Sequence, residues 1–461
     1  MMELKNPIIP AKQQFASSNG PKELDFKAIC IFAATGFFLD SDTYWKNRTC
    51  LGPGQKHWLD EQGKLINSEP YFQWHYDPGS HSFEQALEEY TALLTNITRN
   101  QVKDHPVILP LSGGLDSRSQ ALVLKGLDNP VHAYSYSFLD GYPEHKISKK
   151  IAEQCGFSFE SFIIPKGYLW SSIDDLAQIN SCYSEFTHPR QMAILEDLKA
   201  IQGVFSLGHW GDVLFDRGVP EGTQEDEVME LLLYKMVKKG GMDLANKLWK
   251  TWDLEGDFKS YLVGRIETAL SKINIDNLSA KIRAFKTSQW AHRWTTTNLS
   301  IFEAAHPITL PYYDDAMCQF VCRTNEDFLA DRKLQIAHLK QSPELAKITW
   351  HANKPFNLYN YHLNRSPINL PYRILNKIKR VVDEKRGHKY IQRNWELQFL
   401  GSDNDKLLKE RIFSEDFYEF IPKEIIKDIY HNFTNKDQVY YSHPLSMLLT
   451  FSLWNEHFYT P

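Results

Sequence analysis

The sequence predicts an α/β protein: a parallel-sheet domain, a helix-rich C-terminal part and a small β-rich N-terminal region. Three observations lead to this class. Apolar runs alternate with segments of helical period between residues 107 and 207, as in the βαβ units that build parallel sheets. A Ser-Gly-Gly turn follows the first of these runs, and after about residue 225 helix-like patterns with scattered Trp and Tyr dominate.

Composition excludes several classes of protein. The chain has 461 residues, 42% of them hydrophobic, and a net charge of −5, which allows large cores in two or three domains and gives no nucleic-acid footprint. None of its six cysteines forms a CxxC pair, so neither a disulfide framework nor a zinc ribbon is expected. No signal peptide begins the chain, and the longest apolar run is shorter than the roughly 20 residues that cross a bilayer. We therefore expect a cytoplasmic protein without nucleic-acid or membrane partners.

Residues 26 to about 80 are expected to form strands. The run AICIFAATGFFL, from Ala28 to Leu39, is rich in β-branched and aromatic residues, LGPG at 51–54 is a turn, and HWLDEQGKLI is a hairpin. A helix follows from Ser82 to Asn100, because FEQALEEYTALLTNIT has helical period.

The alternating region predicts the parallel sheet and its helices. Its strands are expected at 107–111, 131–137, 159–164 and 203–207, and its helices at 115–127, 144–155 and 189–200. The sheet built from these strands would be covered by helices, which is how parallel sheets bury both faces.

The stretch VILPLSGGLDSRSQALVL, residues 107–124, places a glycine-rich turn between a strand and a helix N-terminus. This arrangement makes an anion site, because backbone N–H groups and the helix dipole favour negative charge. Gly113 and Gly114 would present N–H groups, and Ser112 and Ser117 would add hydroxyl donors. Asp116 would hold Mg²⁺ that bridges phosphates. The lysine that a GxxxxGK[ST] loop needs is missing.

The string SGGLDS resembles the pyrophosphate loop of the ATP-pyrophosphatase (PP-loop, adenine nucleotide alpha hydrolase-like) superfamily, which cleaves ATP between the α- and β-phosphates. Downstream, the sequence resembles asparagine synthetase. VFSLGHWGDVLFD, residues 204–216, is similar to that family's second motif, through Gly208 and Asp212. The resemblance implies that Asp212 is the second Mg²⁺–pyrophosphate carboxylate.

Two further segments carry the resemblance. HPITLPYYDD, residues 306–315, is similar to the family's Val-Pro-Phe-Leu-Asp segment, and WHANKPF, residues 350–356, to its Trp-Arg-x-Lys-x-x-Phe segment. The latter implies that Lys354, one place later than in the family pattern, reaches the activated intermediate. The alignment also implies an adenosine site lined by Leu111, Tyr136, Leu207 and Gly208.

The second motif departs from the family where chemistry is expected. His209 stands in place of the motif's first Glu, and Val213 in place of the following acid, so aspartate need not be the substrate. His209 suits a general base for an incoming amine, because the ordinary pKa of histidine is about 6.5. A structural histidine that only hydrogen-bonds the loop is the alternative.

The N-terminal region also departs from the family pattern. Residue 2 is Met rather than a nucleophilic Cys, yet residues 43–74 resemble the last strands of the family's glutaminase domain. We expect residues 1–98 to be a truncated β-rich remnant of an amidotransferase domain and residues 99–461 to be the ligase domain. Cys30 lies within an expected apolar strand and suits a buried core residue better than a displaced nucleophile.

Together these features predict an AMP-forming carbon–nitrogen ligase that uses ATP and Mg²⁺. It would adenylate a small-molecule, saccharide or peptide carboxylate and transfer ammonia or an amine, the ammonia coming from solution or from a separate glutaminase. His188 and Arg190, in YSEFTHPRQM, either bind an anionic substrate or belong to an ordinary helix start at Pro189. The segment Arg373–Arg393 holds eight basic and two acidic residues and is either a contact for an acidic partner or a solvated helix face.

Two other functions remain open. A non-catalytic ATP-binding regulatory or assembly subunit would explain the altered second motif, but it would not need Asp116, Asp212 and Lys354. A tRNA-modifying PP-loop enzyme is disfavoured by the net charge and by the lack of CxxC pairs.

Overall fold

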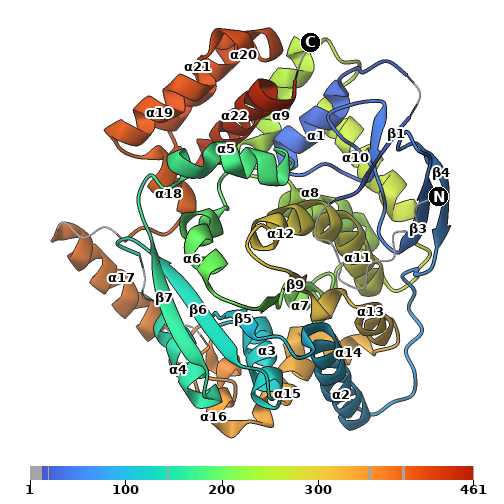
Figure 1. Ribbon diagram of the computed structural model, residues 1–461, viewed down its shortest axis with the longest axis vertical. Helices are drawn as coiled ribbons and strands as arrows, with labels where there is room; N and C mark the ends of the chain where they lie inside the picture. Colours follow the sequence, from blue (N-terminus) through green and yellow to red (C-terminus); the bar gives the residue numbers. More distant parts are fainter. Residues whose placement is uncertain are drawn as a thin grey trace.

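The computed structural model describes residues 13–18, 20–141, 143, 145–350, 355–386 and 390–459. At its centre lies a five-stranded parallel sheet with the strand order β7-β6-β5-β8-β9 (Figure 1). Its strands are β5 Val107–Pro110, β6 Val131–Phe138, β7 Ser158–Ile164, β8 Val204–Ser206 and β9 Ile308–Thr309. The predicted α/β class is confirmed, and the four predicted strands of this sheet are present.

Both faces of the central strand β5 are buried, as is usual in parallel sheets. Side chains alternate along β5, so that Val107 and Leu109 join one apolar cluster with α3 (Leu115–Lys125) and α4 (His145–Cys155). Ile108 points to the other face and joins the largest core cluster of the molecule. This alternation explains why the strand is a continuous apolar run rather than an apolar–polar repeat.

The strand order places a topological switch point between β5 and β8. The chain passes from β5 outward to β6 and β7 on one side, and β8 and β9 lie on the other side. The segments that follow β5 and β8 therefore start next to each other at the carboxyl edge of the sheet and lead away from each other. In open α/β sheets, a crevice of this kind is where ligands bind.

The expected strand over Ala28–Leu39 was wrong. The residues form helix α1, Phe26–Thr35, which begins where the Asp25 carboxylate accepts from the N–H of Ala28 at 3.0 Å. It ends at Gly36, whose φ of 78° is left-handed and suits glycine. From Ala28 to Thr35 the helix is buried on all sides, so tertiary burial outweighed the β propensity of its isoleucines.

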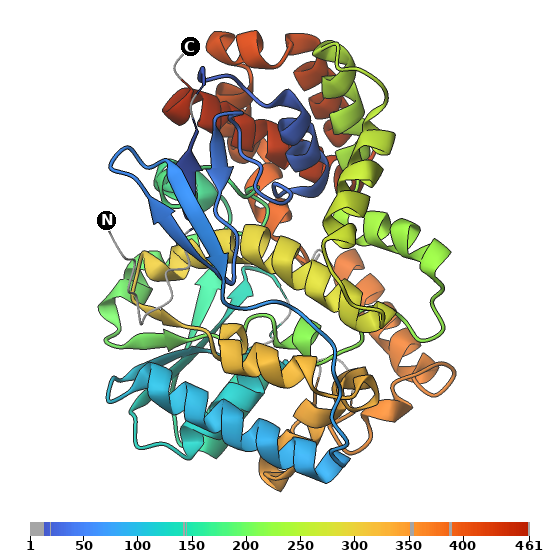
Figure 2. The same ribbon diagram turned by 90° about the vertical axis from the view of Figure 1, so that its right-hand side faces the viewer.

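Four short strands accompany α1 in the N-terminal region. β1 (Phe15–Ser17) pairs with β2 (Arg48–Cys50), and β3 (Gln55–Leu59) pairs with β4 (Leu65–Pro70) in the predicted hairpin. Figure 2 shows this region beside the C-terminal helices. α1 packs against α9 (Gly241–Thr251), and both belong to the same core cluster as the last helix of the chain.

Helices make up most of the remaining chain. They are α2 Phe83–Val102, α5 Leu169–Asn180, α6 Leu195–Ala200, α7 Gly211–Leu214, α8 Val228–Met236, α10 Phe258–Ser271, α11 Leu278–Lys286, α12 Thr296–Glu303, α13 Asp315–Cys322, α14 Glu326–Leu329, α15 Lys333–Lys340, α16 Pro343–Ala346, α17 Leu370–Lys385, α18 Asn394–Phe399, α19 Ser402–Ile412, α20 Glu415–Phe420, α21 Lys423–Asn435 and α22 Gln438–Phe458. A π-helical turn, η3 (Thr287–Thr295), joins α11 to α12. Short 3₁₀ turns are η1 Arg190–Ile194, η2 Glu225–Glu227, η4 Pro311–Tyr313, η5 Ala330–Arg332 and η6 Tyr361–Leu363. Within the described residues, no helix is long and apolar enough to cross a bilayer.

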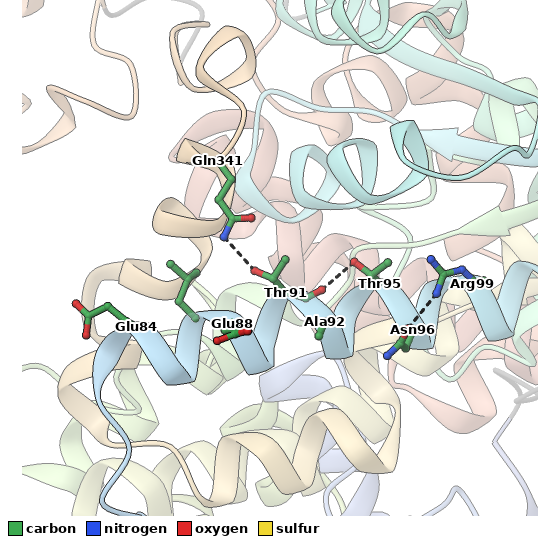
Figure 3. A pocket seen from close by; sticks show the side chains of 9 residues that line it. Glu84, Glu88, Thr91, Ala92, Thr95, Asn96, Arg99 and Gln341 are labelled. Carbon is green, nitrogen blue, oxygen red and sulfur yellow. Dashed lines mark hydrogen bonds between the residues drawn. The ribbon is translucent and has the colours of Figure 1, made fainter.

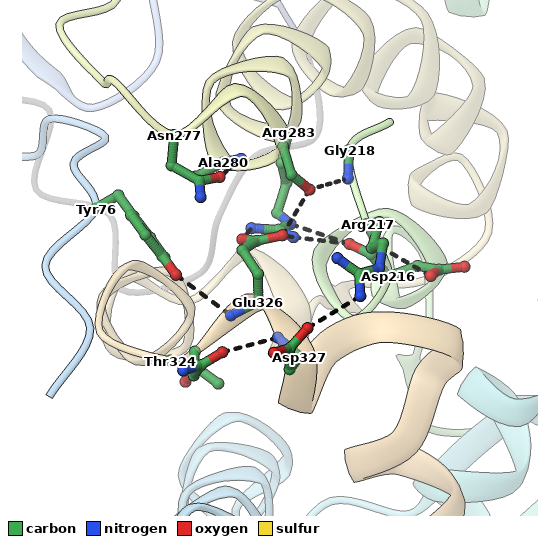
Figure 4. A network of polar contacts seen from close by, with 12 residues as sticks. Tyr76, Asp216, Arg217, Gly218, Asn277, Ala280, Arg283, Thr324, Glu326 and Asp327 are labelled. Carbon is green, nitrogen blue, oxygen red and sulfur yellow. Dashed lines mark hydrogen bonds and ion pairs between the residues drawn. The ribbon is translucent and has the colours of Figure 1, made fainter. Parts of the chain in front are cut away.

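A buried ion pair ties α11 to α14 behind the second motif (Figure 4). The Arg283 guanidinium donates to both carboxylate oxygens of Glu326, at 2.6 and 2.7 Å, and also to the backbone carbonyl of Asp216 at 2.8 Å. Ser279 donates to the same carboxylate at 2.6 Å. Arg283 is 2% exposed, so its charge depends on these partners for solvation.

We therefore expect Glu326→Gln to lower the free energy of unfolding by about 3 kcal/mol, because it leaves a buried guanidinium without its counter-charge. Chemical denaturation measures this loss. The matched control is Glu89→Gln, whose partner Arg323 lies 3.2 Å away in an exposed pair and whose loss should cost less than about 1 kcal/mol. Equal losses in the two variants would show that the Arg283 pair contributes no more than a surface contact.

Candidate active site

The turn after β5 is held by its own serines. The N–H of Ser112 donates to Ser117 Oγ at 3.1 Å, the two hydroxyls lie 2.9 Å apart, and the N–H of Gly114 donates to Ser112 Oγ at 3.2 Å. These hydroxyls, predicted as donors to a phosphate, thus shape the turn. Gly114 is the N-cap of α3 and no side chain caps this helix, so the N–H groups of its first turn remain for an anion.

Asp116 lies in the first turn of α3 and faces two polar side chains of the C-terminal half. Its Oδ1 accepts from the Arg332 guanidinium and from Gln335 Nε2, the latter at 2.9 Å. Burial raises the pKa of Asp116 to about 6, with nearby Asp212 adding to the rise and Arg332 opposing it. The carboxylate is therefore a partly buried anion already faced by a cation.

Two glycines of the second motif allow the loop after β8 to touch Asp116. A Cβ on Gly208 would lie 3.0 Å from the backbone carbon of Asp116, and a Cβ on Gly211 would overlap the Asp116 carboxylate. Asp212 follows, exposed, in the first turn of α7. The two predicted Mg²⁺ carboxylates, Asp116 and Asp212, are thus brought to one place across the switch point, close enough for Asp212 to raise the pKa of Asp116.

The predicted adenosine residues lie at the carboxyl ends of three neighbouring strands. Leu111 follows β5, and its N–H donates to the Tyr134 carbonyl at 2.7 Å. Leu207 follows β8, and both leucine side chains are buried. Tyr136, on β6, is partly exposed, and its hydroxyl accepts from Arg190 at 3.2 Å.

His209 lies in the second motif between the two glycines. Its ring packs at 5.8 Å from that of Phe302, and its Nδ1 is enclosed with no hydrogen-bond partner in the described part of the chain. Burial lowers the pKa of His209 to about 4. The imidazole is therefore neutral at pH 7, and it is a weaker base than an exposed histidine.

A buried arginine, Arg118, connects the turn after β5 to the segment before residue 350. Its guanidinium donates to the Gly113 carbonyl at 3.0 Å and to the Thr349 carbonyl at 3.0 Å. A Cβ on Gly113 would lie 3.2 Å from the Trp350 carbonyl oxygen. Lys354 itself lies outside the described residues, and the N–H of Trp350 donates to the Phe356 carbonyl at 2.9 Å across that gap.

The loop YSEFTHPRQM is built around a buried carboxylate. Glu185 is 2% exposed and accepts from the N–H of Thr187 at 2.6 Å, from Ser446 Oγ at 3.2 Å and from the His188 ring at 3.2 Å. His188 is thus engaged within the loop. Arg190 instead points to β6, toward the Tyr136 hydroxyl and the Phe138 ring, and residues 190–194 form a 3₁₀ turn before α6. The predicted helix over 189–200 is therefore confirmed only in its second half.

Several residues of the site escaped sequence reasoning. Arg332 and Gln335 meet Asp116 from more than 200 positions away, and no local pattern marks them. Nothing in the sequence distinguishes Arg118 from any other position of a helix. Gly211 had a signal, because a second glycine three places after Gly208 indicates close backbone approach.

A groove of about 390 Å³ lies elsewhere, along the outer face of α2 (Figure 3). Polar side chains that line the groove form hydrogen bonds with one another. Gln341 donates to Thr91 at 3.5 Å, and Arg99 donates to Asn96 at 3.0 Å. None of the predicted site residues lines this groove. We therefore place the candidate active site at the switch point and not in the groove.

Comparison with known proteins bears on this site. The family model described as asparagine synthase matches residues 89–292. Residues 89–292 are thus similar to the asparagine synthase family, over somewhat less than half of the chain. The match covers the turn after β5 and the second motif and confirms the predicted resemblance, and it supports an ATP-dependent, amide-forming synthase of the PP-loop type.

Two other comparisons add little to the asparagine synthase match. The structure of NMN synthetase from Francisella tularensis matches 45% of this chain and 93% of its own, with 14% identity and a TM-score of 0.23. A comparison with curated proteins returns no match.

Substituting Gly211 tests the close approach of the second motif to Asp116. We expect Gly211→Ala to lower the free energy of unfolding by about 1–3 kcal/mol, because the added methyl overlaps the partly buried carboxylate of Asp116. Gly264→Ala is the control, since nothing lies within 4 Å of the Cβ position in α10, and it should be neutral or stabilising by up to about 1 kcal/mol. Thermal denaturation distinguishes the two, and a neutral Gly211→Ala would contradict the packing.

A pH profile tests the Glu185 carboxylate. Burial alone would raise its pKa, but His188, His443 and Thr187 outweigh burial and hold the pKa of Glu185 far below its ordinary value of 4.5. A depressed pKa stabilises the fold above pH 4.5, and this contribution is lost as the pH falls toward the folded-state value. We expect Glu185→Gln to cost about 2 kcal/mol at pH 7, with the gap to wild type narrowing below pH 4.5.

Denaturation curves at several pH values measure this gap. Glu196→Gln is the control, because the Glu196 side chain is 84% exposed and its loss should leave the profile parallel to that of wild type. A gap for Glu185→Gln that stays constant from pH 7 to about pH 3 would refute the depressed pKa.

Proposed function

We propose that the chain is an ATP-dependent ligase that activates a carboxylate as an acyl-adenylate and converts it to an amide. One observation carries this proposal. The turn after β5 and the loop after β8 converge on Asp116 at the switch point of the sheet, inside a domain of the asparagine synthase type. An anion-binding turn and two carboxylates at that point suit a nucleotide that loses pyrophosphate.

In the first step, a carboxylate oxygen of the substrate attacks the α-phosphorus, and the bond from that phosphorus to the bridging oxygen breaks. Pyrophosphate leaves toward the N–H groups of Gly113 and the first turn of α3. Asp116 and Asp212 offer the carboxylate oxygens that Mg²⁺ prefers, and the ion would neutralise phosphate charge. Leu111, Tyr136, Leu207 and Gly208 are the proposed walls of the adenosine site.

The cation for the reacting phosphates is proposed to be Lys354. It follows Trp350, whose carbonyl lies against Gly113 of the turn. Arg118 supports this placement, because it bonds the carbonyls of Gly113 and Thr349 with one guanidinium. A lysine carried by this segment would start from the neighbourhood of the leaving group.

In the second step, an amine nitrogen attacks the acyl carbon, AMP leaves and the nitrogen loses a proton. His209 is the proposed acceptor of that proton. Its neutral state at pH 7 leaves a lone pair for this role, although its pKa of about 4 limits its basicity. Arg190, held near Tyr136 at the edge of the same crevice, is the proposed contact for an anionic substrate.

Nitrogen is proposed to come from ammonia, from a separate glutaminase or from an amine on a substrate. Residues 1–98 are proposed to be the non-catalytic remnant of an amidotransferase domain, with residues 99–461 as the ligase domain. Cys30 supports this interpretation, because it is fully buried in α1 and burial raises the pKa of its thiol, whereas a nucleophile needs an accessible thiolate.

The test is pyrophosphate release from ATP and Mg²⁺ with pooled carboxylates (aspartate, uronic acids, small peptides), with and without ammonium. We expect release with one pool only and a loss of about 100-fold or more in Asp116→Asn, because a metal carboxylate is removed. Asp403→Asn, an exposed first-turn aspartate of α19, is the matched control. His209→Gln should keep pyrophosphate release and lose amide formation if His209 serves the second step.

A regulatory or assembly subunit is the second candidate, and one contact favours it. Arg332 occupies Oδ1 of Asp116, one of the two oxygens with which this carboxylate could hold a metal. If ATP binds but no pool yields pyrophosphate above the level of Asp116→Asn, the ligase proposal fails and this candidate replaces it.

A further inference from the structure

Helix α17, Leu370–Lys385, is amphipathic, yet none of its residues is buried. It lies at the rim of the molecule beyond β7 (Figure 1). An amphipathic helix in a globular protein normally turns its apolar stripe toward the core. The apolar stripe of α17 instead faces outward.

The stripe is continuous along the helix. Ile374, Ile378 and Val381 are spaced four and three residues apart, and Leu375 and Val382 are seven apart, so all five share one face at 100° per residue. Their exposed fractions run from 39% at Val382 to 63% at Leu375. Isolated exposed apolar residues are ordinary, but a contiguous stripe of this kind marks an interaction surface.

Basic side chains flank this stripe. Helical geometry places Lys377 along one border and Lys379 and Arg386 along the other, while Arg373 and Arg380 lie on the opposite face. Lys385 lies within the stripe, at the C-terminal end of the helix. The helix and its C-cap carry six basic and two acidic residues within a chain of net charge −5. The surface therefore selects a partner that is apolar at its centre and anionic around it.

We propose that α17 is an interfacial helix that lays its apolar stripe into the headgroup region of an anionic bilayer. Apolar residues on one face with Lys and Arg on the other are what such helices present, and the charges contact acidic headgroups while the stripe enters the acyl boundary. At 16 residues α17 is about 24 Å long, which suits a helix that lies in the membrane plane. The proposal revises the expectation of no membrane partner, which considered only helices that cross a bilayer.

Other occupants fit this surface less well. A second copy of the chain would use the same face twice, as twofold symmetry requires, and would bring the basic borders of two helices together. A nucleic acid would match the charges but leave the five apolar side chains in water.

The helix is tied at both ends to the carboxyl edge of the sheet. Before it, the N–H of Trp350 donates to the Phe356 carbonyl, and the Phe356 ring packs against Tyr372 at 5.7 Å. After it, Gly141 forms a β-bridge with Ile391. A membrane bound to α17 would therefore lie alongside the mouth of the candidate active site.

The test is flotation of the purified full chain with vesicles of phosphatidylcholine alone and of phosphatidylcholine with roughly a third phosphatidylglycerol. We expect wild type to float with the anionic vesicles only, and high salt to release it. Ile374→Ser with Ile378→Ser should lower partitioning by at least about tenfold, because two insertion residues are lost. Lys377→Gln with Lys379→Gln should lower it by a similar factor through lost charge.

Neither double variant touches a buried position, so both should keep the wild-type melting temperature. Ile66→Ser is the matched control, since Ile66 is 66% exposed on β4, and its flotation should not change. Flotation that is absent, or equal in wild type and the α17 variants, would overturn the proposal. So would a dimer in sedimentation equilibrium that is lost with Ile374→Ser and Ile378→Ser. Pyrophosphate release plays no part in these readouts, so the outcome is independent of the ligase assay.

Discussion

The contact between the second motif and Asp116 is the constraint on which the site depends. Backbone atoms of Gly208 and Gly211 occupy space that any Cβ would fill, and this packing brings Asp212 within electrostatic reach of Asp116. Arg332 and Gln335 hold the same carboxylate from the C-terminal half. Three segments that are distant in sequence therefore meet at one carboxyl group, and a shift of the first two would separate the two acids.

Electrostatics around that carboxyl group explain why distant elements are needed. A carboxylate without partners in this setting would be costly, since burial by itself raises the pKa of Asp116. Arg332 offsets this cost, and Arg283 does the same for the buried carboxylate of Glu326. Both pairs also join elements that are distant in the sequence and that apolar packing alone would leave free to shift.

The N-terminal region shares in this architecture. α1 is buried in the same core cluster as α9 and α22, and Arg293, from the π-helical turn, donates to the backbone carbonyls of Asp40 and Asp42. The Thr287 hydroxyl in the same turn accepts a hydrogen bond from the Trp210 indole of the second motif at 3.0 Å. The N-terminal residues are thus connected through a single helix to the loop that carries His209 and Asp212.

The sequence by itself determined four of the five strands of the central sheet and the two glycine-rich motifs, because hydrophobic period and turn chemistry are local properties. The fifth strand, β9, has two residues and is defined by its pairing with β8. Local patterns misassigned α1, since seven consecutive apolar residues, Ala28–Ala34, suit a buried helix as well as a strand, and only the surrounding core decides between them. Only the tertiary structure brings Arg332, Gln335 and Arg118 to the site. Their hydrogen-bond partners lie in distant segments of the chain, and no spacing of residues in the sequence marks such pairs. The outward apolar stripe of α17 was likewise decided there: periodicity shows that a helix has an apolar face, and only the packing of the other elements leaves that face uncovered.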